Sequence, residues 1–236
     1  MRMARTSFFV SAGLLCLVLG ITVQAEAATV TFVSDTSWEA FDSNPLSGGT
    51  SLGQAQHVCL NVGCPSSCPP GATSYSYACG YWGADLGTIP GAHWIWKPGI
   101  DATSVPADLA LVCLAKTLTL VGVVISATVS VAADDYAEVQ INGQSVGSVG
   151  SVTDYGMAAG AQGALVTFNA APYLVSGSNE IVVCAQNGPS SYTGLSCNPC
   201  NYSQNPTGVV FGGAIELDQS TALKNPAWGQ LKVLYR

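Results

Sequence analysis

The stretch of sequence that decides the fold is residues 131–143, VAADDYAEVQING. Outward and inward side chains alternate from Tyr136 to Ile141, which is the pattern of a half-buried β-strand. Asn142-Gly143 then supplies the two central residues of a type I′ turn, and residues 145–149 return as a second strand. The sequence therefore predicts a β-hairpin, with the pair Asp134-Asp135 immediately before it.

Runs rich in valine, isoleucine, threonine and aromatic residues occur on both sides of this hairpin, separated by clusters of glycine, asparagine, proline and serine. They predict further strands at residues 29–34, 93–97, 110–120, 123–132, 164–169, 180–186 and 208–217. Residues 181–183 and 209–211 are continuous apolar runs, which favours positions inside sheets rather than at their edges. Helical periodicity is almost absent, so we expect an all-β fold, an antiparallel β-sandwich.

The first 27 residues have the pattern of a secretory signal peptide. Arg2 and Arg5 precede an apolar core at residues 8–21, and Ala25-Glu26-Ala27 offers the small residues that signal peptidase accepts. The apolar core is too short to cross a bilayer comfortably, so we expect no membrane span. The expected location is therefore outside the cell, either secreted or at the cell surface.

The chain carries few charges, with 14 acidic and 7 basic residues and a formal net charge of −7. Phosphate backbones and anionic membranes bind basic surfaces, so this balance argues against both as partners. Low charge does not indicate disorder here, because disordered chains are typically charged and poor in β-branched residues. We expect one folded domain at residues 28–218, followed by a C-terminal tail at residues 219–236.

Of the nine cysteines, all but Cys16 follow the expected signal peptide, and an even number in an exported chain favours disulfides. Cys113 and Cys184 each fall within an expected strand, so we expect this pair to join neighbouring strands or the two sheets. The remaining pairs are assigned by proximity alone, as Cys59–Cys79, Cys64–Cys68 and Cys197–Cys200. Zinc is the alternative, because the last two cysteines form a C-x-x-C motif and His57 lies close to the first.

Residues 42–91 form a long, irregular segment with four of the cysteines and few strand signals. A segment of this kind has too little apolar patterning for a core of its own. We therefore expect a cysteine-rich insert that its disulfides hold closed.

Several segments, taken in order, resemble a known family. They are Trp94-Ile95-Trp96, the stretch at residues 131–143, Leu174-x-x-Gly177-x-Asn179-Glu180-Ile181-Val182-Val183, and Gly208-Val209-Val210-Phe211. Together they resemble the galactose-binding-like jelly-roll modules found beside catalytic domains in bacterial rhamnosidases and β-galactosidases. The resemblance covers a little over half of the chain after the expected signal peptide. It implies a jelly roll of two packed antiparallel sheets, export, and often carbohydrate or calcium binding at loop ends, and it does not imply an enzyme.

The pair Asp134-Asp135 is a candidate calcium site. Adjacent carboxylates supply the hard oxygen ligands that calcium prefers, and the pair is similar to one used by sugar-binding adhesins of related architecture. Two residues offer too few oxygens, so Asp154, Asn142 or a loop carbonyl would have to complete the shell. The alternative is structural, with one aspartate accepting backbone N–H bonds to fix the turn into the hairpin.

Four aromatic residues, Tyr81, Trp82, Trp94 and Trp96, are candidates for stacking on a sugar ring. In a strand Trp94 and Trp96 project to the same face, where they form either an exposed platform or part of the core. Large aromatic side chains dominate cores, which favours the second interpretation. Tyr81-Trp82 lies between two glycines in an expected loop and is the better candidate for exposure.

No catalytic motif accompanies these residues. His57 and His93 are the only histidines, and the chain has no G-x-S-x-G elbow, zinc-binding helix motif or phosphate loop. We therefore expect a secreted, non-catalytic module that binds a glycan or an extracellular protein surface, with calcium as a candidate cofactor. The alternative is a structural or adhesive component of an extracellular matrix, filament or surface layer, built by self-assembly.

Overall fold

The computed structural model describes residues 27–64 and 68–219, so the expected signal peptide and most of the expected tail lie outside it. One sheet consists of β1 (Ala27–Val33), β4 (Gln56–Val62), β5 (Thr73–Ala78), β6 (Ile95–Trp96), β8 (Val123–Asp134), β11 (Val166–Asn169) and β13 (Gly208–Asp218). The other consists of β2 (Glu39–Phe41), β3 (Ser51–Gln54), β7 (Leu111–Leu120), β9 (Tyr136–Ile141), β10 (Gln144–Gly150) and β12 (Gly177–Gln186). An α-helix, α1 (Tyr155–Gly163), connects β10 to β11.

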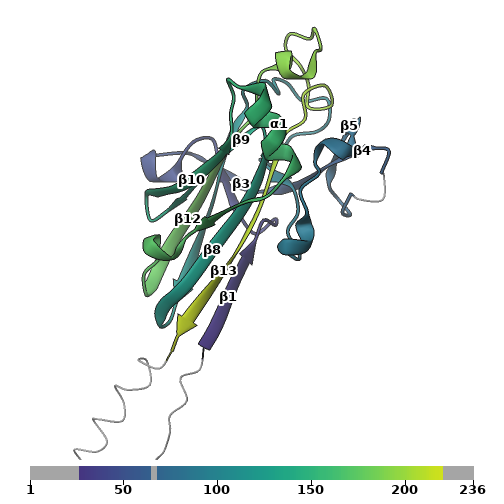
Figure 1. Ribbon diagram of the computed structural model, residues 1–236. Coiled ribbons are helices and arrows are strands. Elements are labelled where there is room, and N and C mark those ends of the chain that lie inside the picture. Colours follow the sequence, from purple (N-terminus) through teal and green to yellow (C-terminus); the bar gives the residue numbers. More distant parts are fainter. Residues whose placement is uncertain (1–26, 65–67, 220–236) are drawn as a thin grey trace, which may run out of the picture.

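The two sheets form a sandwich, which confirms the all-β fold with a disulfide-rich insertion (Figure 1). The first sheet has the order β11–β8–β13–β6–β4–β5, with β1 also paired to β13, and the second has the order β10–β9–β12–β7–β2–β3. Neighbouring strands run antiparallel except β4 and β5, which run parallel. No helix in the described part of the chain is long and apolar enough to cross a membrane.

The predicted hairpin is present as β9 and β10. Asn142 and Gly143 both have positive φ, 53° and 76°, as a type I′ turn requires. The side chain of Asn142 also fixes the turn against its neighbours. Its Oδ1 accepts a hydrogen bond from the backbone N–H of Glu180 at 3.0 Å, and its Nδ2 donates to the carbonyl of Tyr173 at 2.9 Å.

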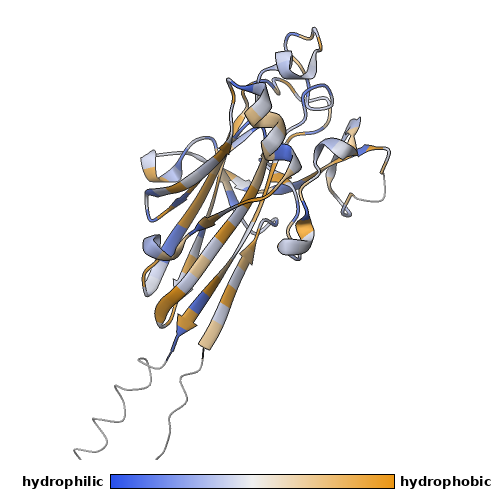
Figure 2. Ribbon diagram, in the orientation of Figure 1, coloured by the Kyte–Doolittle hydropathy of each residue, from blue (hydrophilic) through white to orange (hydrophobic). Residues whose placement is uncertain are grey.

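The two long apolar strands lie inside their sheets, as their sequences predicted. β12 lies between β9 and β7, and β13 lies between β8 on one side and β1 and β6 on the other. Residues 181–183 and 209–211 are fully buried. Figure 2 shows hydrophobic residues running along the long central strands. Burial of this apolar surface is the main force that holds the sandwich together.

The segment at residues 42–91 is more regular than the sequence suggested. It contributes β3, β4 and β5, and β4 joins the first sheet through β6. Val58, Leu60 and Tyr75 from this segment are buried in the main core. This disulfide-rich segment therefore holds strands that the sequence did not indicate, and β5, which alternates serine with tyrosine, carries little apolar signal.

Two of the four expected disulfides are also corrected. The structure joins Cys59 to Cys68 and Cys64 to Cys79, in place of Cys59–Cys79 and Cys64–Cys68. The reason is the parallel pairing of β4 with β5, which sets Cys59 opposite Ser74 and Val62 opposite Ala78. Cys79 follows β5 directly and so comes close to the cysteine that follows β4.

The other two disulfides are those that the sequence predicted, Cys113–Cys184 and Cys197–Cys200. Cys113 and Cys184 lie directly opposite each other on β7 and β12, so this bridge joins neighbouring strands of one sheet. Among the described residues, no group of three or more histidine, cysteine, aspartate or glutamate side chains is placed to hold a metal ion. All eight cysteines in the described chain are joined in disulfides, so none is left as a thiolate ligand for the alternative zinc site.

Candidate ligand-binding site

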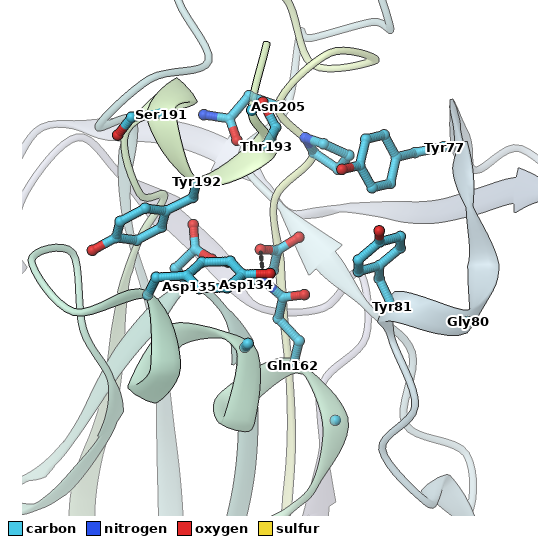
Figure 3. Close-up of a pocket in the computed structure, with 15 residues that line it drawn as sticks. Tyr77, Gly80, Tyr81, Asp134, Asp135, Gln162, Ser191, Tyr192, Thr193 and Asn205 are labelled. Atoms are coloured by element: carbon cyan, nitrogen blue, oxygen red, sulfur yellow. Dashed lines mark hydrogen bonds between the residues drawn. The ribbon is translucent and has the colours of Figure 1, made fainter.

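A cavity of about 650 Å³ opens at the end of the sandwich where four segments of the chain meet. β5 and the turn after it supply Tyr77, Gly80 and Tyr81, and the junction of β8 and β9 supplies Asp134 and Asp135. The helix α1 supplies Tyr155, Ala159, Gln162 and Gly163, and the connection between β12 and β13 supplies Ser191, Tyr192, Thr193, Gly194, Asn205 and Pro206. Figure 3 shows the aspartates in the middle of this group.

The two aspartates are buried and fully hydrogen-bonded. Asp134 is 6% exposed and Asp135 3%. The Nε2 of Gln162 donates to an Oδ1 on each carboxyl group, at 2.8 Å in both cases. The Nε1 of Trp82 donates to Oδ2 of Asp134 at 2.7 Å, and the backbone N–H of Gly188 donates to Oδ2 of Asp135 at 2.6 Å. All four carboxyl oxygens therefore accept a bond from an N–H group.

Burial raises the pKa of both carboxyl groups. For Asp134 the effect is large, because the neighbouring charge of Asp135 adds to desolvation, while the hydrogen bond from Trp82 opposes them. For Asp135 desolvation also dominates, partly offset by hydrogen bonds from Asp134 and from the N–H of Gly188. Within the described chain, the cavity lining contains no lysine, arginine or histidine to offset the negative charge. The pair therefore retains a proton at a pH where exposed aspartates are ionised.

Close backbone packing allows this arrangement. A Cβ on Gly188 would collide with Oδ2 of Asp135 and would lie 2.7 Å from the ring of Tyr192. Only a residue without a side chain brings its N–H so close to the carboxyl group. At the other aspartate, the hydroxyl of Thr207 donates to the carbonyl of Asp134 at 2.7 Å and holds the end of β8 against β13.

The helix α1 places Gln162 over the aspartates. Asp154 caps its N-terminus, accepting a hydrogen bond from the backbone N–H of Met157 at 3.1 Å. Ala158 and Ala161 are its buried residues and pack the helix against the sandwich. Gln162 lies in the last turn, and its position was not predicted, because this glycine- and alanine-rich segment has no apolar periodicity.

Four tyrosines form the walls in two pairs. The rings of Tyr77 and Tyr81 lie 5.1 Å apart, and those of Tyr155 and Tyr192 lie 5.6 Å apart. Figure 3 shows Tyr77 and Tyr81 on one side of the aspartates and Tyr192 on the other. Tyr81 and Tyr155 are 52% and 55% exposed, so their rings are accessible to a ligand. Of the four, only Tyr81 was predicted as a site residue.

The three predicted tryptophans do not line the cavity. Trp94 is 7% exposed and Trp96 is fully buried, so the exposed-platform interpretation is wrong for both and the core interpretation is confirmed. Trp82 is half-buried, and its ring stacks on that of Trp94 with 4.3 Å between centroids. This stack fixes the indole N–H that binds Asp134.

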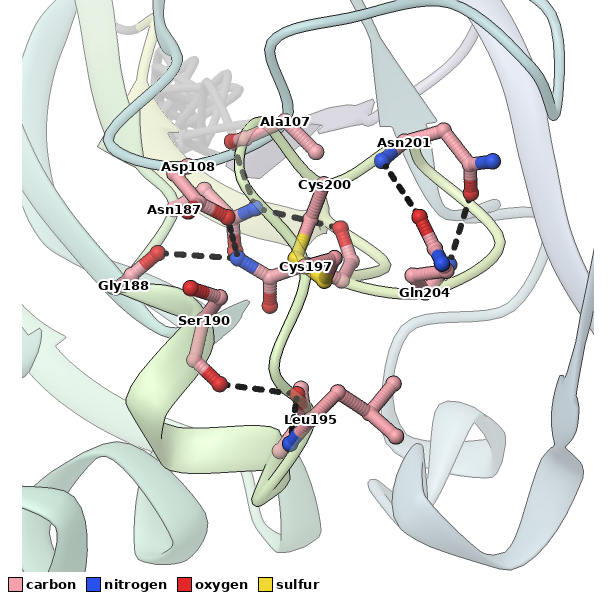
Figure 4. The surroundings of a disulfide bond; sticks show 12 residues. Ala107, Asp108, Asn187, Gly188, Ser190, Leu195, Cys197, Cys200, Asn201 and Gln204 are labelled. Carbon is pink, nitrogen blue, oxygen red and sulfur yellow. Dashed lines mark hydrogen bonds between the residues drawn. A yellow bond between two sulfur atoms is a disulfide. The ribbon is translucent and has the colours of Figure 1, made fainter.

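The connection between β12 and β13 forms the remaining wall, and hydrogen bonds and a disulfide hold it in place (Figure 4). The Nδ2 of Asn187 donates to the carbonyl oxygens of Ala107 and Asn205, at 2.8 and 3.2 Å. Cys200 is fully buried, and the Cys197–Cys200 bridge closes the loop on itself. These hydrogen bonds and the disulfide therefore hold the loop in place as a wall of the cavity.

The residues present do not fit a calcium ion. Calcium takes six to eight oxygen ligands, whereas the pair supplies at most four carboxyl oxygens, and no third acidic side chain in the described chain is placed to join them. Asp154 is used as the cap of α1. Asn142 lies at the far end of β9, roughly 20 Å from Asp135 at the usual rise of a strand. Asp135 does accept a backbone N–H bond, but the donor is Gly188 in the connection after β12 and not a residue of the turn into the hairpin.

Comparison with known proteins gives partial similarities only. No family model matches the chain, and no curated protein matches it. A solved structure of Streptomyces avermitilis α-L-rhamnosidase complexed with L-rhamnose is 22% identical, with a TM-score of 0.38 over 52% of this chain and 10% of the rhamnosidase. Bacteroides uniformis β-glucuronidase is 12% identical, with a TM-score of 0.38 over 80% of this chain and 18% of the glucuronidase. The chain thus spans less than a fifth of the length of either enzyme.

Proposed function

We propose that the chain is a secreted, non-catalytic module that binds a glycan in the cavity at the end of the sandwich. The observation that carries this proposal is the arrangement of two tyrosine pairs around a floor of hydrogen-bonding groups. Aromatic rings stack on the apolar faces of sugars, and the polar groups of the floor and rim suit hydroxyls. A volume of about 650 Å³ lies in the range of small-molecule sites.

The geometry of the carboxyl groups favours binding over hydrolysis. Most glycosidases place two carboxyl groups on opposite sides of the scissile bond, several ångströms apart. Here one amide nitrogen, the Nε2 of Gln162, reaches an oxygen of both groups at 2.8 Å. The two carboxyl groups therefore lie side by side on one side of the cavity. The resemblance to galactose-binding-like modules, which does not imply an enzyme, supports the same function.

Binding should not require calcium, because the pair lacks the further acidic ligands that would complete the ion's shell. A glycan array followed by calorimetry on the strongest ligand tests both parts of the proposal. We expect specific binding that EDTA leaves unchanged. Replacement of either exposed ring, by Tyr81→Ala or Tyr155→Ala, should weaken binding about three- to tenfold through lost stacking.

A control variant at the other end of β9 shows whether loss of binding comes from the cavity itself or from any change to the protein surface. Leu46→Ala removes a side chain that is 47% exposed and lies beside the β9–β10 turn, so it should bind as the wild type does. The absence of any glycan ligand, or equal binding by all variants, would contradict the proposal. Loss of binding in EDTA, restored by Ca²⁺, would overturn its calcium-independent part alone.

One observation favours the alternative of self-assembly. Among the described residues β1 pairs with β13 alone, so its other edge is open to a further strand. Val121 in the connection from β7 to β8, and Val123 and Ile125 at the start of β8, are also exposed, each by more than half. These features lie away from the cavity, so self-assembly and glycan binding are separable by experiment.

A further inference from the structure

We infer that the cavity selects a sugar that carries a free amino group, and holds its ammonium between the tyrosine pairs, above Asp134 and Asp135. This inference rests on the proposed function and adds the charge of the ligand to it. Three features of the cavity carry it: an uncompensated acidic floor, a wall of aromatic rings and a polar rim.

The first feature is the charge balance. The two carboxyl groups are buried, and the cavity lining within the described chain has no cationic side chain. Lys116 lies elsewhere, donating to the hydroxyl of Ser37 at 2.7 Å and facing the ring of Trp38. The charged groups of a binding site attract ligands of opposite charge and repel ligands of like charge. The floor therefore repels uronic acids and sulfated or phosphorylated sugars, and attracts an ammonium group.

The second feature is the set of four tyrosine rings. Aromatic faces are negative and attract cations, by about 0.5–2 kcal/mol for each well-placed ring. The rings within each pair are inclined to each other, by 54° for Tyr77 and Tyr81 and by 64° for Tyr155 and Tyr192. Inclined rings present faces and edges to the same space instead of stacking flat on each other. A group placed above the aspartates thus meets aromatic surface from more than one direction (Figure 3).

The third feature is the rim, which decides between an amino sugar and a simple alkylated ammonium. Ser191, Thr193 and Asn205 line the cavity. The hydroxyl of Thr193 donates to the carbonyl of Ser190, and the Nδ2 of Asn205 donates to Asp108 and to the carbonyl of Gly188, so the rim offers mainly oxygen atoms as acceptors. A quaternary ammonium ligand offers them nothing to bond, whereas the hydroxyls of a sugar ring do. An amino sugar matches the aspartates, the rings and the rim together.

Proton exchange gives the inference a distinct signature. The proton that the aspartate pair retains is favoured by burial and by the repulsion between the two groups. An ammonium group placed above the pair stabilises the ionised carboxylates, so the bound complex releases that proton to the solvent. A neutral sugar in the same position leaves the proton in place.

The test compares two trisaccharides that differ in one respect, the glucosamine trimer and its fully N-acetylated form. Calorimetry at mildly acidic pH, where the amine is charged, should show about tenfold tighter binding of the amine, equivalent to about 1.4 kcal/mol. Repeating the titration in two buffers of different ionisation enthalpy should show proton release for the amine alone. Added salt should weaken binding of the amine and leave that of the acetylated trimer unchanged.

Variants at an exposed ring test the aromatic contribution without endangering the fold. Tyr81→Phe keeps the ring and should keep the preference for the amine, whereas Tyr81→Leu should reduce it severalfold. Equal or tighter binding of the acetylated trimer, or binding of neutral glycans only, would overturn the inference and leave glycan binding intact. Failure to bind any glycan at all would overturn both.

Discussion

Asp134 and Asp135 are costly residues to bury, and the protein offsets that cost with N–H donors taken from three places in the chain. Trp82, Gln162 and Gly188 lie far apart in the sequence and converge on the pair. A buried polar group without such partners would cost a few kcal/mol. The aspartates are therefore part of the structural framework of the site as well as its chemical floor.

We expect the pair to make the protein less stable as the pH rises. The pKa of each carboxyl group is raised in the folded state, so the folded protein binds more protons than the unfolded chain between about pH 4 and the raised pKa. The stability that the pair contributes is complete below about pH 4 and is lost as the pH passes the raised pKa. Melting temperatures measured across the acidic to neutral range should therefore show this decline.

The variant Asp134→Asn isolates the effect, because it removes one of the two titrating groups. Hydrogen bonds from Thr50 and Thr103 lower the pKa of Asp42 and Asp101. Those two carboxyl groups therefore titrate at lower pH, and they contribute equally to the wild type and to the variant. The difference between wild type and variant should decline as the pH rises. A difference that does not change with pH would contradict the assignment.

A single methyl group at Gly188 should damage the site. In Gly188→Ala the Cβ meets Asp135 and Tyr192, so we expect a loss of about 1–3 kcal/mol in unfolding free energy and weaker ligand binding. The matched control is Gly160→Ala, within α1, where a Cβ meets no atom within 4 Å. That change should stabilise the protein by about 0.5–1 kcal/mol, since alanine favours helices. Chemical denaturation of both variants measures the contrast.

At the scale of elements, the sequence predicted what alternation and turn chemistry encode. The strands β7, β8, β12 and β13 were predicted within a few residues of their observed bounds, because their apolar runs are long. β2 and β3 were missed because each has only three or four residues. α1 was missed because three of its nine residues are glycine and its helical pattern is weak. The candidate site was the least well predicted part of the molecule, since two of its four segments, β5 and α1, are elements that the sequence did not predict.

The two disulfides that the sequence predicted correctly should differ in what they do. Cys113–Cys184 joins central strands across 71 residues, so its replacement by alanines should cost about 4 kcal/mol of unfolding free energy. Cys197–Cys200 spans only three, so the same change should cost about 2 kcal/mol or less. That bridge closes a wall of the cavity, however, and its loss should weaken ligand binding.

Melting curves and calorimetry on the two double variants measure this contrast. The variant without Cys113–Cys184 should still bind ligand at temperatures where it is folded. Equal losses of stability, or unchanged binding without the Cys197–Cys200 bridge, would contradict the division of roles.

At the scale of the whole molecule, α1, which lines the cavity, lies at the opposite end of the sandwich from the start of β1 and the end of β13 (Figure 1). β8 begins opposite Asp218, the last residue of β13, and ends opposite Gly208 beside the cavity. Eleven residue steps along β8 correspond to about 36 Å. Ala27, where the described chain begins, pairs with Asp218. A module held through either end of its chain therefore presents the cavity away from the point of attachment.

This separation makes the two candidate functions independently testable. We expect the chain from Ala28 onward to be a monomer by light scattering, because Val121, Val123 and Ile125 form only a small exposed apolar group. The double variant Val123→Ser/Ile125→Ser should bind glycan with unchanged affinity, since these residues lie at the end remote from the cavity. A wild-type polymer that this variant abolishes would instead favour the structural function. If the double variant no longer polymerises but still binds glycan, both functions reside in one chain, at opposite ends of the sandwich.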